Sequence, residues 1–333
     1  MPTVKNYLSL VKFSHTIFAM PFALIGFFVA SWPNIYLWKV SKKLGLPGGI
    51  SWVNDNRGFD KGSVELHYMG FDDLRNKFII VIFILVIICM ITARSAAMAF
   101  NRYLDRHFDA RNPRTAIREI PAGIISANGA LWFTIINCLV FIAATWFINP
   151  LCFFLSPVAL FVILFYSYTK RFTALCHLVL GLGLSLAPIG AYLAVTGQFG
   201  LLPILFSLVV LFWVSGFDII FALQDEKFDR SHNLHSIPVA LGVPKALLVS
   251  RVFHLLSFGM VVMAGFVGGF GLLFWVGAAV FGGMLVFQHS IVKPHDLSRV
   301  NIAFMTANGT ASVVFAAFVI ADLFFAEYNK LPF

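Results

Sequence analysis

Charged residues are scarce in this chain. Only 12% of its 333 residues are Asp, Glu, Lys or Arg, whereas 59% are hydrophobic and the mean hydropathy is +0.87. A soluble globular domain carries about 25% charged and 45–50% apolar residues, so the composition excludes that class and a disordered chain as well. Because long uncharged stretches recur along the whole length, the sequence predicts a multi-pass membrane protein.

Cysteine is also scarce. The four cysteines all lie inside apolar stretches and no two are spaced as CxxC; they are Cys89, Cys138, Cys152 and Cys176. Isolated cysteines in such surroundings behave as small hydrophobic side chains. The pattern therefore excludes a disulfide framework and a cysteine-based metal site.

Apolar stretches long enough to span a membrane are what the chain does contain. A spanning helix needs about 20 apolar residues. We predict nine spans, at about 14–33, 78–101, 128–148, 150–168, 175–196, 201–223, 246–268, 270–290 and 302–326. Lipid cannot satisfy an open backbone, and the alternation of a barrel strand is absent, so we expect helices throughout. The predicted fold is a single all-α transmembrane domain over residues 1–333.

Basic residues gather at alternate ends of these spans. They occur at the N-terminus and in the loops after the second, fourth, sixth and eighth spans, whereas the turns near Asn149, Gly197 and Gly269 have none. This distribution follows the positive-inside rule and places the N-terminus and the basic loops in the cytoplasm. We therefore expect an inner (plasma) membrane protein with no nucleic-acid partner. Its net charge of +9 mostly reflects the basic residues that fix the orientation of the spans in the membrane.

Residues 34–77 do not follow that pattern. The segment holds seven Lys or Arg residues but must lie outside the cytoplasm on this scheme. Long segments obey the positive-inside rule poorly. We predict an extra-cytoplasmic insert with a structural capping role.

Two sets of polar residues share a spacing of seven and then four residues. Near the end of the second span lie Arg94, Asn101, Asp105 and Asp109, and near the end of the sixth lie Asp218, Asp225 and Asp229. If the helices continue, each set lies on one helix face. The matching positions also predict a duplication, with two four-helix halves related by an axis along the membrane normal and a ninth helix added.

Facing stacks of carboxylates require a cation. Hard oxygen ligands without a His or Cys pattern suit Mg²⁺, which is usually held by a few carboxylates together with substrate phosphates. The nearby Arg and Lys side chains would complete a phosphate site. Solvated helix ends are the alternative, but Arg94 and Asp218 lie inside spans, where ionisable residues are functional candidates. The pattern predicts a magnesium-diphosphate clamp at the cytoplasmic end of the bundle.

These motifs resemble the UbiA superfamily of intramembrane prenyltransferases. Asn101-Arg-Tyr-Leu-Asp105-Arg-His-Phe-Asp109 is similar to the family's NDxxDxxxD, and Asp218-Ile-Ile-Phe-Ala-Leu-Gln-Asp225-Glu-Lys-Phe-Asp229 is similar to DxxYAxxDxxxD. Tyr166-Ser-Tyr-Thr-Lys170-Arg171 resembles the family's YxxxK element. Two positions depart from the pattern, because Arg102 replaces the usual second Asp and Phe221 the usual Tyr.

The resemblance implies an enzyme that transfers a polyprenyl group from its diphosphate to an aromatic ring in quinone synthesis, with 4-hydroxybenzoate as the first acceptor to test. It implies that Mg²⁺ is held by Asp105, Asp109, Asp225 and Asp229. It implies substrate binding by Asn101, Arg102, Arg114, Tyr166, Lys170 and Arg171. Asp218 would accept a proton or orient the acceptor, and Arg94 would bind the acceptor carboxylate.

Several alternatives stay open from the sequence. Arg102 favours a menaquinone branch with a dihydroxynaphthoate acceptor, and haem or a glycerol lipid are further acceptors within the superfamily. A cation or solute transporter is the main alternative of another class. Carriers, however, place ionisable groups near the midplane, whereas most of these carboxylates lie at one face. The expected partners are the lipid bilayer and the two substrates, with no obligate protein partner.

Overall fold

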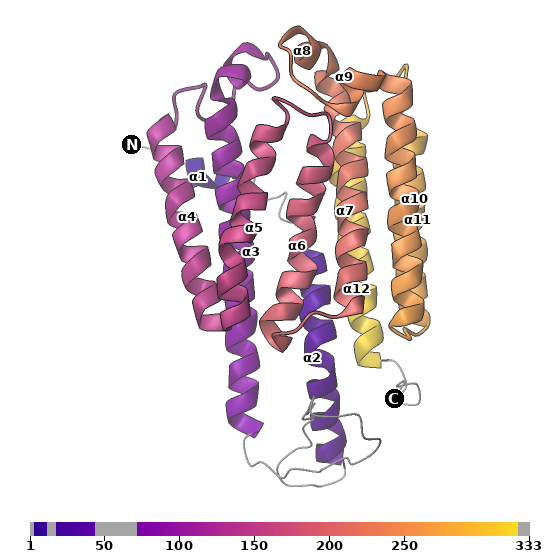
Figure 1. The fold of residues 1–333 in the computed structure, drawn as a ribbon. Coiled ribbons are helices and arrows are strands. Elements are labelled where there is room, and N and C mark those ends of the chain that lie inside the picture. The colour runs from indigo at the N-terminus through magenta and orange to yellow at the C-terminus, as the bar shows by residue number, and fades with distance from the viewer. Residues whose placement is uncertain (1–2, 12–17, 44–71, 326–333) are drawn as a thin grey trace.

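The computed structural model describes residues 3–11, 18–43 and 72–325, and these residues are almost entirely helical. The helices run roughly side by side and form one elongated bundle (Figure 1). The long ones are α2 (Met20–Lys43), α3 (Asp72–Arg111), α4 (Ala127–Ile148), α5 (Pro150–Thr169), α6 (Cys176–Thr196), α7 (Leu201–Ala222), α10 (Val243–Val267), α11 (Leu272–Ile291) and α12 (Asn308–Phe325). The short ones are α1 (Val4–Leu10), η2 (Leu223–Asp225), α8 (Glu226–Ser231), α9 (Ile237–Leu241) and the π-helix η3 (Ile302–Ala307).

Among the described residues, eight helices are long and apolar enough to cross a membrane. They correspond to the eight spans predicted from residue 78 onward. The predicted first span, 14–33, is matched from Met20 by α2, whose shorter apolar stretch is Met20–Ser31, and residues 12–17 lie outside the described residues. The all-α membrane fold is therefore confirmed, whereas the count of nine spans is not.

The predicted insert at 34–77 begins and ends in helix. α2 continues to Lys43 and α3 already begins at Asp72, while residues 44–71 lie outside the described residues. The C-terminal end of α2 and the N-terminal end of α3 lie at the opposite end of the bundle from α8 and α9 (Figure 1). The described parts of the insert, up to Lys43 and from Asp72, therefore lie away from the end of the bundle that carries the polar motifs.

Local sequence signals determine where the helices end and the chain turns. Asn149 ends α4 and caps α5, where its side chain accepts from the backbone N–H of Cys152 at 2.8 Å, and Pro150 takes the first helical position. The Asn149 side chain also donates to the carbonyl of Leu193 at 2.9 Å. Gly197 ends α6 with φ of +65°, a conformation that glycine adopts without strain.

α7 is the most buried helix and packs against α6 on one side and α10 on the other. Its Trp213 is fully buried among the rings of Phe22, Phe281 and Phe217. The approach to α6 is close, because a Cβ on Gly181 would lie 2.5 Å from the carbonyl oxygen of Leu211. Small residues permit such backbone contact between membrane helices. This tight pairing fixes the position of the polar end of α7 relative to α6.

Candidate active site

A cavity of about 280 Å³ opens among the polar ends of α3, α5, α6 and α7. Every residue that the sequence predicted for the site lines it: Arg94, Asn101, Arg102, Asp105, Asp109, Arg114, Tyr166, Lys170, Arg171, Asp218, Asp225 and Asp229. These residues lie on separate helices and loops up to 135 positions apart in the sequence (94 to 229). The fold therefore brings the two motifs and the basic residues to one place.

The first motif lies on a continuous helix, as its spacing predicted. α3 runs unbroken to Arg111, so Asn101, Asp105 and Asp109 follow one another along one face. Asn101 donates to Oδ2 of Asp105 at 3.2 Å. Asp109 is the most buried of the three at 6% exposure.

The second motif is not a single α-helix, which differs from the expectation. α7 ends at Ala222, a 3₁₀ turn follows over Leu223–Asp225, and α8 begins at Glu226. The tighter turn changes the angular step per residue. Asp218, Asp225 and Asp229 therefore stand on three successive elements, and Asp229 is buried at 1% exposure.

Basic residues pair with each carboxylate of the predicted metal set. Arg171 contacts Asp105 at 2.8 Å, Lys170 contacts Asp229 at 2.7 Å, and Arg118 contacts Asp109 at 2.7 Å. Arg114 donates two hydrogen bonds to Asp225, one from Nε to Oδ1 at 3.0 Å and one from Nη2 to Oδ2. These pairs connect the loop after α3 and the turn after α5 to both motifs, so they hold the two halves of the site together.

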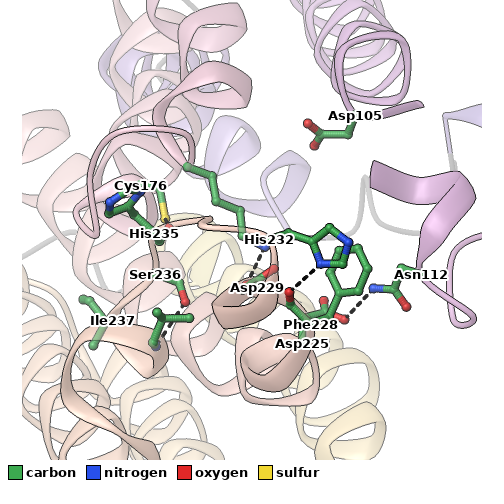
Figure 2. Close-up of polar contacts among 12 residues, drawn as sticks. Asp105, Asn112, Cys176, Asp225, Phe228, Asp229, His232, His235, Ser236 and Ile237 are labelled. Atoms are coloured by element: carbon green, nitrogen blue, oxygen red, sulfur yellow. Dashed lines mark hydrogen bonds and ion pairs between the residues drawn. The ribbon is translucent and has the colours of Figure 1, made fainter. Parts of the chain in front are cut away.

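Asn112 adds a further link between the motifs. Its amide donates to Oδ1 of Asp225 at 3.3 Å, and Figure 2 shows it directed at Asp225 from the loop after α3. The second-motif loop is also tied to α5, because the backbone N–H of His235 donates to the carbonyl of Lys170 at 2.7 Å. His232 is held within its own loop, where Nδ1 lies 3.0 Å from the carbonyl of Phe228.

The surroundings of Lys170 stabilise its positive charge. Burial by itself lowers the pKa of Lys170, but the ion pair with Asp229 and the charge of Asp225 outweigh that effect and raise the pKa above its ordinary value. Lys170 is therefore a permanent cation at the mouth of the cavity.

Several buried polar atoms of residues in the cavity wall have no hydrogen-bond partner among the described residues. They include Oδ2 of Asp109, Nη1 of Arg102 and Nε of Arg94. An unsatisfied buried polar atom costs about 1–3 kcal/mol, so the site is suited to a ligand with a cationic part for Asp109 and anionic parts for the two arginines. A metal ion for Asp109, together with anionic groups of the substrates for the two arginines, satisfies both demands.

The donor set fits Mg²⁺ shared with a substrate. Within the described residues, no three His, Cys, Asp or Glu side chains lie close enough to hold a metal by themselves. Mg²⁺ normally takes only one or two carboxylates and completes its shell with water and phosphate oxygens. The carboxylates present would therefore hold the ion together with a diphosphate.

A second cavity, of about 360 Å³, continues from the first into the apolar interior. The two share Arg94, Tyr166, Leu180 and Leu184 in their walls. The deeper walls come from α3, α4, α5 and α6 and are almost wholly apolar, with side chains such as those of Val86, Phe141, Ile163 and Leu186. A polar chamber thus adjoins an apolar one large enough for a hydrocarbon chain.

Three residues of the site were missed in the sequence. Arg118 and Asn112 lie in the loop after the first motif, and nothing in their spacing shows that they meet Asp109 and Asp225. His177 contacts Asp218 at 2.6 Å between Nδ1 and Oδ2. The rule that ionisable residues inside a span are functional candidates would have selected His177 as it selected Arg94.

Comparison with known proteins gives a consistent picture. The model of the UbiA prenyltransferase family matches residues 73–317. A 4-hydroxybenzoate octaprenyltransferase of Nitrosomonas europaea is 32% identical over 260 residues, which cover 77% of this chain and 87% of that protein.

Solved structures show the same fold. A UbiA homolog from Aeropyrum pernix K1 superposes with a TM-score of 0.72 and 26% identity, covering 92% of this chain and 98% of that one. A UbiA homolog from Archaeoglobus fulgidus, bound to GPP and Mg²⁺, has a TM-score of 0.66 and 17% identity, covering 96% of this chain and 99% of that one. The latter likeness concerns the fold alone.

Proposed function

The chain belongs to the UbiA prenyltransferase family and is a prenyltransferase, and we propose that it transfers a polyprenyl group from a polyprenyl diphosphate to the ring of 4-hydroxybenzoate or a similar aromatic acid, with Mg²⁺. The observation that carries the proposal is the junction of a polar chamber lined by paired carboxylates and basic residues with an apolar chamber. The relatives named 4-hydroxybenzoate octaprenyltransferase support the choice of acceptor.

The diphosphate would bind where the ion pairs now lie. Mg²⁺ held by Asp105, Asp109, Asp225 and Asp229, with Asn101 assisting, would neutralise the charge of the diphosphate as it leaves. The basic partners of these carboxylates would then turn to the phosphate oxygens, with which Arg forms strong charge-assisted hydrogen bonds. They are Arg114, Lys170 and Arg171, with Arg102 as a further phosphate-directed cation.

The polyprenyl chain would occupy the apolar cavity. Burying hydrocarbon contributes about 0.8 kcal/mol per CH₂, so several isoprene units supply substantial binding energy. Tyr166 and Arg94 line both cavities and so mark the place where the polar and apolar parts of the donor meet.

The aromatic acceptor would lie on the side of the polar chamber formed by Arg94 and Asp218. Arg94 would bind its carboxylate, and Asp218 would accept from its hydroxyl. The bond between prenyl C1 and the diphosphate oxygen breaks, and its electron pair leaves with the diphosphate. A ring carbon beside the hydroxyl then bonds C1, and its hydrogen departs as a proton to the Asp218 carboxylate or the released diphosphate.

Aromatic side chains would shield the allylic cation. Phe217, Phe221 and Phe304 line the polar chamber, and the rings of Phe221 and Phe304 lie 4.2 Å apart. Ring faces stabilise cations electrostatically. The same walls exclude water, which would otherwise capture the cation.

The distribution of Lys and Arg supports a plasma-membrane location with the polar chamber on the cytoplasmic side. A dihydroxynaphthoate acceptor remains the second candidate, favoured by Arg102 in place of the family's usual Asp. The transporter alternative is not favoured by relatives that are prenyltransferases.

Prenyl transfer by the purified protein in lipid tests the proposal. A labelled polyprenyl diphosphate and Mg²⁺ would be supplied with 4-hydroxybenzoate or a dihydroxynaphthoate in parallel, and Asp105→Asn would serve as the inactive control. Product with 4-hydroxybenzoate alone supports the first acceptor, and product with the naphthoate alone replaces it. Absence of both product and Mg²⁺-dependent diphosphate binding overturns the proposed function.

A further inference from the structure

His177 is a buried histidine to which the proposed reaction assigns no role. It stands on the first turn of α6, is 2% exposed, and lines the polar cavity. Its Nδ1 lies 2.6 Å from Oδ2 of Asp218 on α7. The short contact joins the candidate acceptor-binding carboxylate to a second ionisable group.

The other ring nitrogen reveals where the proton lies. The backbone N–H of Ile237, at the start of α9, donates to Nε2 of His177 at 3.4 Å. A backbone N–H is a donor, so this contact assigns Nε2 as an acceptor. In that arrangement the ring proton of His177 lies on Nδ1, from which it is donated to Oδ2 of Asp218.

This arrangement determines what Asp218 offers the cavity. Oδ2 is engaged by His177, and no other hydrogen bond reaches the Asp218 side chain from the described residues. The side chain is 23% exposed and lines the chamber. A carboxylate fixed at one oxygen presents the other in a constant direction as an acceptor.

We propose that His177 is a positioning residue for the transfer, which fixes the Asp218 carboxylate and directs its Oδ1 to the ring hydroxyl of the acceptor. The proposal rests on the proposed function and names the acceptor as a hydroxylated ring. As the ring carbon bonds prenyl C1, positive charge develops on the hydroxyl oxygen, and its hydrogen bond to Asp218 strengthens. Preorganised acceptors of this kind stabilise a transition state without reorganising.

The same geometry excludes a proton relay through the imidazole. Nε2 faces the Ile237 N–H, so a proton that reached His177 from Asp218 would have no acceptor beyond it. His177 instead connects Asp218 to the segment that follows the second motif, since Ile237 comes eight residues after Asp229. The position of Asp218 and the position of that segment therefore depend on each other.

The first test reads the proton position directly. Nitrogen NMR of the full-length protein in lipid, with labelled histidine, distinguishes Nδ1–H, Nε2–H and the imidazolium, and His177→Phe assigns the signal. We expect a neutral ring protonated at Nδ1. An imidazolium or an Nε2–H form overturns the proposal whatever the activity.

The second test separates positioning from folding. His177→Phe keeps a ring but removes the donor, and we expect kcat for 4-hydroxybenzoate prenylation to fall about 10- to 100-fold with Mg²⁺-dependent binding of the prenyl diphosphate unchanged. His177→Asn restores an amide donor beside Asp218 and should recover part of the loss. His289→Phe is the control, because that histidine pairs with His254 between α10 and α11, outside the cavity wall.

The outcomes distinguish the two proposals. Full activity of His177→Phe, with Asp218→Asn inactive, overturns the role of His177 and leaves the proposed function intact. If His177→Phe does not fold, His177→Asn and His177→Leu provide the comparison, and equal activity of these two contradicts the inference. A wild-type protein that neither binds the diphosphate nor makes product overturns both.

Discussion

Arg171 and Asp105 form an ion pair of 2.8 Å although 66 residues separate them in the chain. The guanidinium also donates to the carbonyls of Ser167 and Leu104, so it is held between α5 and α3. A diphosphate with Mg²⁺ offers each partner a stronger contact, because the carboxylate gains a metal and the arginine gains phosphate oxygens. The pair therefore marks one corner of the site at which both partners would contact the ligand.

Replacement of Arg171 tests this exchange. Arg171→Ala should weaken prenyl diphosphate binding, since a hydrogen bond to a charged group is worth about 1.5–3 kcal/mol, or about 10- to 100-fold in Kd. Arg171→Lys should recover part of the affinity. Titration of labelled diphosphate in the presence of Mg²⁺ measures the effect. Lys245→Ala, an exposed cation at the start of α10, is the control, and an equal loss there would contradict the assignment.

Removal of the metal should leave the protein folded. Each carboxylate of the predicted metal set already has a basic partner, so the fold does not depend on Mg²⁺ for charge balance. We expect a chelator to abolish diphosphate binding without a shift in Tm. Mg²⁺ together with prenyl diphosphate should raise Tm, since a ligand at 100 times its Kd adds about 2.7 kcal/mol of stability. Unfolding caused by the chelator alone would refute this expectation.

Arg94 provides a test of the acceptor. Arg94→Ala should raise KM for 4-hydroxybenzoate by about 10- to 100-fold, the value of a lost charge-assisted hydrogen bond, and should leave diphosphate affinity unchanged. A phenol without a carboxylate should be used equally well by both proteins. Steady-state kinetics with the two acceptors decide the matter, and an unchanged KM for 4-hydroxybenzoate in the variant would eliminate this role for Arg94.

The spacing of the first motif was sufficient to predict its geometry, because Asn101, Asp105 and Asp109 lie on an unbroken helix. The second motif has the same spacing, yet a 3₁₀ turn at Leu223–Asp225 interrupts it. Turns of this kind depend on how α8 and α9 pack, which local spacing does not encode. The predicted helical spans were reliable for a similar reason, since lipid imposes one solution on every apolar stretch.

Contacts between distant segments were beyond prediction. The pairs His177–Asp218 and Arg114–Asp225 join residues 41 and 111 positions apart. Their formation depends on helix packing and loop paths, which only the folded chain determines. The sequence identified which residue types gather at one end of the bundle, whereas the structure alone shows which carboxylate meets which cation.

The close contact between α6 and α7 fixes the position of His177 relative to Asp218. A Cβ on Gly181 would lie 2.5 Å from the carbonyl oxygen of Leu211 and 2.4 Å from Oγ of Ser215, so the helices must separate to admit it. Gly181→Ala should therefore lower stability by about 1–3 kcal/mol, as overpacking does, and should reduce kcat by displacing Asp218.

Gly283 in α11 supplies the control, since a Cβ there meets no atom within 4 Å and the residue lies outside the walls of both cavities. Gly283→Ala should be neutral or stabilise the protein by up to about 1 kcal/mol through helix propensity. Thermal denaturation in detergent and prenyl transfer in lipid measure both variants. Equal Tm values for the two variants would show that α6 and α7 separate at little cost to admit a methyl group at Gly181. Their close contact would then not be what aligns the catalytic end of the bundle.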